Sequence, residues 1–119
     1  MIDCLHHASR IWWSAFLLTL AFEVPVYALL TRGKVAAWRA VASAVLCSAV
    51  THPLLWFAWK RLGMSYAAYL VTGELLVVAV ESAIFWKAAG GLTFRRAALT
   101  ALAANAASCL AGLLLQRMT

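Results

Sequence analysis

The sequence predicts an all-α polytopic membrane protein, an up-down bundle of four transmembrane helices. Of its 119 residues, 66% are hydrophobic and only 12% are charged, and the mean hydropathy is +0.88. A soluble domain of this size must present a largely polar surface to water, which this composition cannot supply. The chain also contains four apolar stretches, each close to the roughly 20 residues that a helix needs to cross a bilayer. A membrane bundle accounts for both observations.

The first predicted span covers about residues 11–30, and the second covers about residues 37–59. The first is longer than the apolar core of a typical signal peptide and contains an acidic residue, so we interpret it as a mature helix. Pro25 lies in the first span and Pro53 in the second. A proline cannot donate a hydrogen bond to the carbonyl four residues earlier, so we predict a kink at each position.

The third and fourth predicted spans cover about residues 66–86 and 97–115. Short loops join all the spans, which forces consecutive helices to run antiparallel and to pack as neighbours. The sequence therefore predicts one transmembrane domain over residues 1–119. Small residues recur at intervals of four on the second and fourth helices, where they favour close helix packing inside the bundle or between copies of the chain.

The net charge of +6 does not indicate a nucleic-acid partner. The basic residues are scattered over every loop, and no soluble domain is present to gather them on one face. The expected partner of these side chains is the lipid bilayer, through its headgroups. Six basic residues lie in the first and third loops and four lie at the opposite side, a bias that favours both termini outside the cytoplasm.

Three of the four acidic residues lie inside the predicted spans, at Glu23, Glu74 and Glu81. A carboxylate within hydrocarbon is energetically expensive, so intramembrane acids usually face a bundle interior or a water-filled cavity. They often mark an ion, proton or substrate site. Their placement is the main functional clue in this sequence.

Polar residues on all four helices fall at similar depths. With a rise of about 1.5 Å per residue, five of them lie about 10–16 Å from the side that bears the termini, and Glu81 lies at about 22 Å. Glu81 follows Glu74 by seven residues on nearly the same helix face, so it can continue a path across the membrane. The candidate ion, proton or substrate site consists of Glu23, His52, Glu74, Glu81, Asn105 and Ser108.

The leading hypothesis is a small transporter or channel-like protein that binds a proton or cation within the membrane. Four short helices barely enclose a path, so we expect a homo-oligomer, most simply a two-fold dimer. One alternative is an intramembrane enzyme that acts on a lipid-soluble substrate with Glu74 or Glu23 as acid or base and His52 as base or metal ligand. Another alternative is a non-catalytic subunit of a larger membrane complex.

Two further interpretations concern the same acids. Glu23, His52 and Glu74 offer mixed carboxylate and imidazole ligands of the kind that suit zinc, manganese or iron, so a divalent metal ion is a possible cofactor. The chain has no HExxH motif, and its three cysteines form no CxxC pair, so the cysteines are interpreted as packing residues. In a purely structural role, Glu23 and Glu74 are protonated and bond neighbouring polar side chains, which fixes the helix register.

The predicted spans contain four short motifs: Glu23-Val-Pro25, Thr51-His-Pro-Leu54, Glu74 with Glu81, and Asn105-x-x-Ser108-x-x-x-Gly112. These motifs resemble those of an uncharacterised family of small four-span prokaryotic membrane proteins. The resemblance implies a four-helix unit in a prokaryotic cytoplasmic membrane and implies no function. Beyond size and span number the chain does not resemble the small multidrug exporters, which carry one essential glutamate in an early helix.

Overall fold

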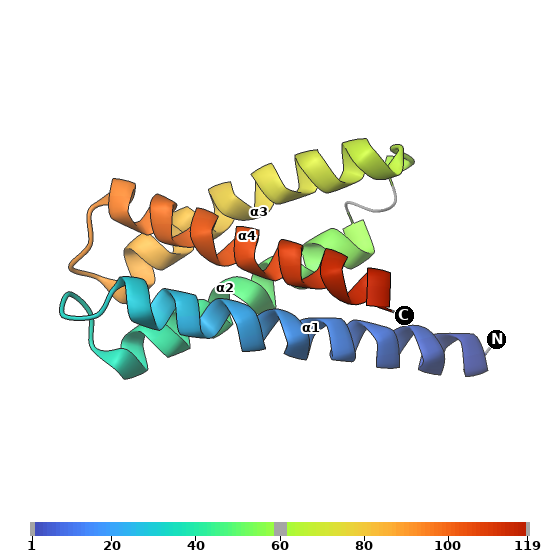
Figure 1. Cartoon of the computed structure of the whole chain (residues 1–119), viewed down its shortest axis with the longest axis horizontal. Helices are drawn as coiled ribbons and strands as arrows, with labels where there is room; N and C mark the ends of the chain where they lie inside the picture. Colours follow the sequence, from blue (N-terminus) through green and yellow to red (C-terminus); the bar gives the residue numbers. More distant parts are fainter. Residues whose placement is uncertain (1, 59–61, 119) are drawn as a thin grey trace.

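Helices make up nearly all of the chain in the computed structural model, which describes residues 2–58 and 62–118. The all-α prediction is confirmed, because the described residues form helices and their connecting turns. Figure 1 shows the arrangement, with both termini at one end of a molecule 47 Å long. In chain order the elements are α1 (Ile2–Leu30), α2 (Ala37–Pro53), the π-helical segment η1 (Leu54–Ala58), α3 (Tyr66–Ala89) and α4 (Phe94–Met118).

Four helices are long and apolar enough to cross a membrane, as predicted. The apolar spans are Trp12–Leu30, Ala37–Phe57, Tyr66–Ala89 and Phe94–Leu115. The third span ends three residues later than predicted, and the fourth begins three residues earlier. The end of the second predicted span, residue 59, lies outside the described residues.

Local signals explain where α3 ends and α4 begins. Gly90 and Gly91 adopt positive φ angles of 70° and 71°, which glycine reaches without steric cost, and they terminate α3. The hydroxyl of Thr93 accepts a hydrogen bond from the backbone N–H of Arg96 at 3.2 Å, so it caps the first turn of α4. Ser65 caps α3 in the same way, by accepting from the N–H of Ala68 at 3.3 Å.

Each helix packs against two others, as an up-down bundle requires. α1 contacts α2 and α4, and α3 contacts the same two helices. Figure 1 shows α3 diverging from α4 toward the end of the molecule that bears the termini. The bundle is therefore tight at the end formed by the 31–36 and 90–93 connections and opens at the other.

Small side chains allow the tight packing. Ala40 and Ala44 on α2, and Ala101 and Ala104 on α4, are fully buried, which brings the helix backbones close together. The α2 stripe of small residues at intervals of four is thus used inside the bundle from Ala40 onward, in agreement with the intramolecular alternative. Large apolar side chains such as leucines and valines point outward instead, as expected for a surface that meets lipid.

The two prolines have different effects on their helices. α1 continues through Pro25 to Leu30. By contrast, α2 ends at Pro53 and the chain continues as the π-helical segment η1. Because Pro53 cannot donate to the carbonyl one turn earlier, a switch to π-helical bonding at this position has a direct chemical cause.

Candidate functional site

A cavity of about 230 Å³ lies between the helices, and all six residues of the predicted site line it. The volume accommodates several water molecules. All four helices contribute to its wall, and no lysine or arginine is among the described residues that line it. The predicted residues that it brings together are Glu23, His52, Glu74, Glu81, Asn105 and Ser108.

The Glu81 carboxyl connects all four helices. It is buried, and it accepts hydrogen bonds from the hydroxyl of Tyr27 on α1 at 2.9 Å and from the hydroxyl of Thr51 on α2 at 2.9 Å. The side-chain amide of Asn105 on α4 donates to the same carboxyl at 2.6 Å. Three donors from three neighbouring helices therefore fix the position of this acid on α3.

This geometry corrects one expectation about Glu81. The adjacent Ser82 is not its partner, because Ser82 donates to the backbone carbonyl of Val78 in its own helix. Glu81 appeared to lie about 7 Å deeper than Asn105 when residues were counted from the span ends. The two side chains are hydrogen-bonded, because such counting ignores how the helices are shifted along one another.

Glu23 is held by two serines. Its carboxyl is buried and accepts hydrogen bonds from Ser48 on α2 at 3.0 Å and from Ser108 on α4 at 2.8 Å. Ser48 belongs to the small-residue stripe of α2, so it serves both close packing and hydrogen bonding. These two contacts tie α1 to α2 and α4 within the bundle.

Hydrogen-bond counting indicates that both carboxyls can carry a proton. The Thr51 hydroxyl lies 2.9 Å from Glu81 Oε1 and also 2.9 Å from the backbone carbonyl four residues earlier. The Ser108 hydroxyl likewise lies between Glu23 Oε1, at 2.8 Å, and a backbone carbonyl of α4, at 3.1 Å. A hydroxyl donates only one hydrogen bond, so both contacts are satisfied together when the carboxyl oxygen is protonated and donates to the hydroxyl.

Glu74 and His52 differ from the other two acids. Glu74 is half-buried, and within the described part of the chain no side chain donates a hydrogen bond to its carboxyl. His52 is 8% exposed, and its Nδ1 atom is buried without a hydrogen-bond partner among the described residues. Buried polar atoms are normally paired, so these two groups have unused bonding capacity beside the cavity.

Aromatic rings surround the imidazole of His52. Its ring centroid lies 5.8 Å from that of Trp12, 5.4 Å from that of Phe16 and 6.0 Å from that of Trp56. These contacts hold the imidazole between α1 and η1. The three surrounding aromatic side chains position the histidine through packing, and its Nδ1 atom has no hydrogen-bond partner among the described residues.

The structure does not support the metal site predicted from the sequence in the way that it supports the cavity. Within residues 2–58 and 62–118, no group of three or more His, Cys, Asp or Glu side chains is arranged to hold a metal ion. Glu23, moreover, already accepts hydrogen bonds from two serines. Metal binding by Glu23, His52 and Glu74 remains a prediction from the sequence, and the function proposed below does not depend on it.

Two hydrogen-bonding residues of the site were missed from the sequence. Tyr27 lies four residues after Glu23, which places both on one face of α1, and this spacing was an available signal. Ser48 was interpreted as a packing residue because the alanines around it gave no indication of a polar partner.

Comparisons with protein families, with curated proteins and with solved structures find no match to this chain. The function proposed below therefore depends on the chemistry of the cavity.

Proposed function

We propose that this protein is a small membrane transporter or channel-like protein whose cavity binds a proton or a cation. The observation that carries the proposal is a cavity lined by three carboxyl groups and one imidazole, with no lysine or arginine among its described lining residues. Acidic groups within a membrane protein are costly unless they are neutralised by protons or by a bound cation. A cavity lined in this way favours positively charged occupants and disfavours anions.

The hydrogen bonds indicate different roles for the acidic residues of the cavity. Glu23 and Glu81 each accept bonds from neighbouring helices, so their main role is to hold the helices in register. Glu74 and His52 keep free bonding capacity, and we assign ligand binding to them. Asn105 lines the path beside Glu74.

This division gives a simple coupling mechanism. A carboxylate at Glu74 binds either a proton or a cation, and the arrival of one displaces the other. His52 offers a neighbouring nitrogen that accepts a proton or hydrogen-bonds the incoming ligand. Exchange at Glu74 on opposite sides of the membrane would couple proton movement to cation movement. The homo-oligomer expected from the sequence stays part of this proposal, since a second copy would help to enclose the path.

Proton flux in liposomes tests the proposal. The purified protein is reconstituted around a trapped pH-sensitive dye, and a membrane potential or a cation gradient is imposed. We expect wild-type flux above that of empty liposomes, and loss of this flux in Glu74→Gln and His52→Ala. Ser82→Ala is the matched control, because Ser82 bonds its own helix and does not line the cavity.

The folded state of each variant is checked by size-exclusion chromatography and circular dichroism. Flux in the wild type equal to that of empty liposomes under every gradient would contradict the proposal. Wild-type flux in a folded Glu74→Gln variant would also contradict it.

A further inference from the structure

An apolar groove of about 510 Å³ runs along the outer side of α3 and α4. The side chains of Val71, Leu75 and Leu110 in its wall are 60%, 67% and 61% exposed, so the groove is open to the surroundings of the bundle. Because both helices are membrane spans, those surroundings are lipid. The groove is also lined by Leu70, Glu74, Asn105, Ala106 and Cys109.

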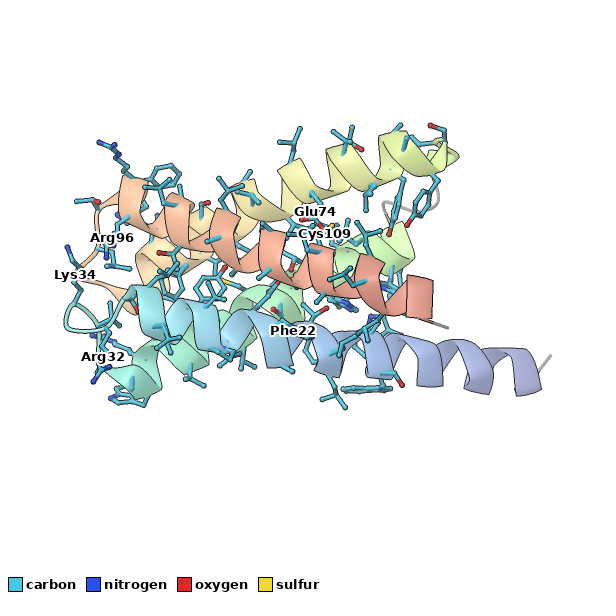
Figure 2. The ribbon with its side chains drawn as sticks, viewed as in Figure 1. Phe22, Arg32, Lys34, Glu74, Arg96 and Cys109 are labelled. Atoms are coloured by element: carbon cyan, nitrogen blue, oxygen red, sulfur yellow. The ribbon has the colours of Figure 1, made fainter. Side chains whose placement is uncertain are left out.

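The groove and the polar cavity share four residues, Leu70, Glu74, Asn105 and Cys109. Figure 2 shows Glu74 on α3 and Cys109 on α4, labelled where these two helices face each other. Glu74 therefore stands where the lipid-facing groove meets the polar interior. Glu74 is the acidic residue that lines both spaces, and the accessible surface of the groove itself is almost wholly apolar.

We propose that the substrate is an amphipathic organic cation that enters from the bilayer between α3 and α4. Its hydrocarbon part occupies the groove, and its positively charged head meets Glu74 and His52. This assignment rests on the proposed function and names the class of cation. The charge complementarity argues for it, since the groove borders a cavity that holds a carboxyl without a hydrogen-bond partner, and no lysine or arginine is among the described residues of the cavity wall.

The charged head of the substrate, and not its hydrocarbon chain, should determine which molecules bind. Lipid tails are as apolar as leucine side chains, so a hydrocarbon chain gains little when it moves from the bilayer into the groove. The attraction between the charged head and Glu74 must then supply most of the affinity. A lipid acyl chain or a second copy of the protein would fill the groove without using that carboxyl.

Binding to protein in lipid nanodiscs tests this inference. The probes are octylammonium, octanol and octanoate, which share a chain length and differ in the charge of the head. We expect saturable binding of octylammonium to the wild type and none of the other two. Replacing Glu74 by Gln removes the charge partner, and we expect the affinity for octylammonium to fall by about tenfold or more.

A steric variant tests the route. Ala106 is exposed in the groove, so Ala106→Trp should fill it and abolish octylammonium binding, and Ala106→Leu provides a milder substitution should the first fail to fold. Ala42→Trp is the matched control, because Ala42 is exposed on α2 and lines neither space. We expect this control to bind octylammonium as the wild type does.

The outcomes separate the inference from the proposed function. Unchanged octylammonium binding in the folded Ala106 variants, or equal binding of octanol, would overturn the inference, while loss of proton flux in Glu74→Gln would still support a proton or cation site. A folded Ala106→Trp variant that loses a dimer yet keeps octylammonium binding would identify a second copy as the occupant and also overturn it. Absence of flux in the wild type would remove the proposed function itself.

Discussion

At the scale of single residues, the acids of this bundle have two different environments. Glu81 and Glu23 are surrounded by hydrogen-bond donors from other helices, whereas Glu74 and His52 face the cavity without such partners. A buried network in which every member is bonded stabilises one arrangement of the helices. An unpaired polar group beside a cavity is instead available to a ligand. The two pairs should therefore respond differently to substitution.

Two substitutions of Glu81, by glutamine and by leucine, should affect stability very differently. Glutamine keeps one acceptor oxygen for Tyr27 and Asn105, and its amide nitrogen can donate to Thr51, so we expect Glu81→Gln to stay within about 1 kcal/mol of the wild-type stability. Leucine leaves the donors of Tyr27 and Asn105 unpaired, so we expect Glu81→Leu to lower the free energy of unfolding by about 2–4 kcal/mol. Unfolding in mixed micelles with increasing denaturing detergent measures both. Equal stability of the two variants would contradict the network.

Ser48 and Ser82 provide a second matched pair. Ser48 bonds the Glu23 carboxyl on another helix, whereas Ser82 bonds the backbone of its own helix. Ser48→Ala should therefore cost about 1 kcal/mol of stability, a typical value for an interhelical hydrogen bond in a membrane, and Ser82→Ala should cost close to nothing. The same unfolding assay compares them, and a greater loss in Ser82→Ala would show that the assignment is wrong.

The residues that line the cavity were easier to predict from the sequence than the hydrogen bonds between them. Residue type and depth were sufficient to select the six residues that share the cavity, because polar groups within spans have few alternatives to facing inward. The partners of Glu81 depend on how α3 and α4 are shifted along each other, which no local pattern encodes. For the same reason Tyr27 and Ser48 were missed as donors.

At the scale of helices, the break after Pro53 shapes one wall of the site. η1 begins at Leu54, and Leu55 both lines the cavity and accepts, through its backbone carbonyl, a hydrogen bond from the hydroxyl of Tyr69 at 3.4 Å. A π-helical turn at this position is wider than an α-helical one, which changes the directions of the side chains that follow. Segments of this type often occur at functional sites.

Pro53→Ala should allow α2 to extend into this segment. The new backbone N–H can donate to the carbonyl of Ala49, so we expect the free energy of unfolding to rise by about 1–2 kcal/mol. We also expect proton flux to fall, because the wall around Leu55 changes its geometry. Amide hydrogen exchange across Leu54–Ala58 and the liposome assay measure the two effects.

Pro25→Ala is the control, because α1 continues through Pro25 without a change of helix type. It should leave proton flux unaltered. If Pro25→Ala and Pro53→Ala had equal effects on flux, the π-helical segment would have no special role.

The helices themselves were predictable because hydropathy fixes them directly. All four spans were placed to within three residues at the described ends, and the errors fall at α3 and α4, where the glycine pair and the Thr93 cap set the boundary. The capping signals were visible in the sequence, but the apolar pattern alone ended the third span too early and began the fourth too late. The groove along α3 and α4 depends on how these two helices pack, and it was not predictable.

At the scale of the whole molecule, charge distinguishes the two ends of the bundle. The connections over residues 31–36 and 90–93 lie at one end, with six basic residues in or beside them, and three of the four acidic residues lie inside the spans. From this bias the positive-inside rule predicts that this end faces the cytoplasm and that both termini lie outside. On this prediction the groove and cavity are nearer to the outer face, since Tyr66 and Gly112 line the cavity at the other end.

Cysteine labelling tests this orientation. In a background with Cys4→Ser and Cys109→Ser, in which the buried Cys47 remains, one cysteine at a time is introduced at Ala36, at the basic end, or at Leu62, at the opposite end, both of which are exposed positions. A membrane-impermeant maleimide applied to intact cells should label Leu62→Cys, and it should label Ala36→Cys only after lysis. The reverse pattern would show that the termini face the cytoplasm.

Two glutamine variants, Glu74→Gln and Glu81→Gln, separate ion binding from helix packing in the same liposome proton-flux assay. We expect Glu74→Gln to abolish the flux, because this carboxyl binds the ion. We expect Glu81→Gln to retain most of the flux, because glutamine preserves the network that holds the helices. Loss of flux in Glu81→Gln with wild-type flux in Glu74→Gln would show that the roles assigned to the two acids are wrong.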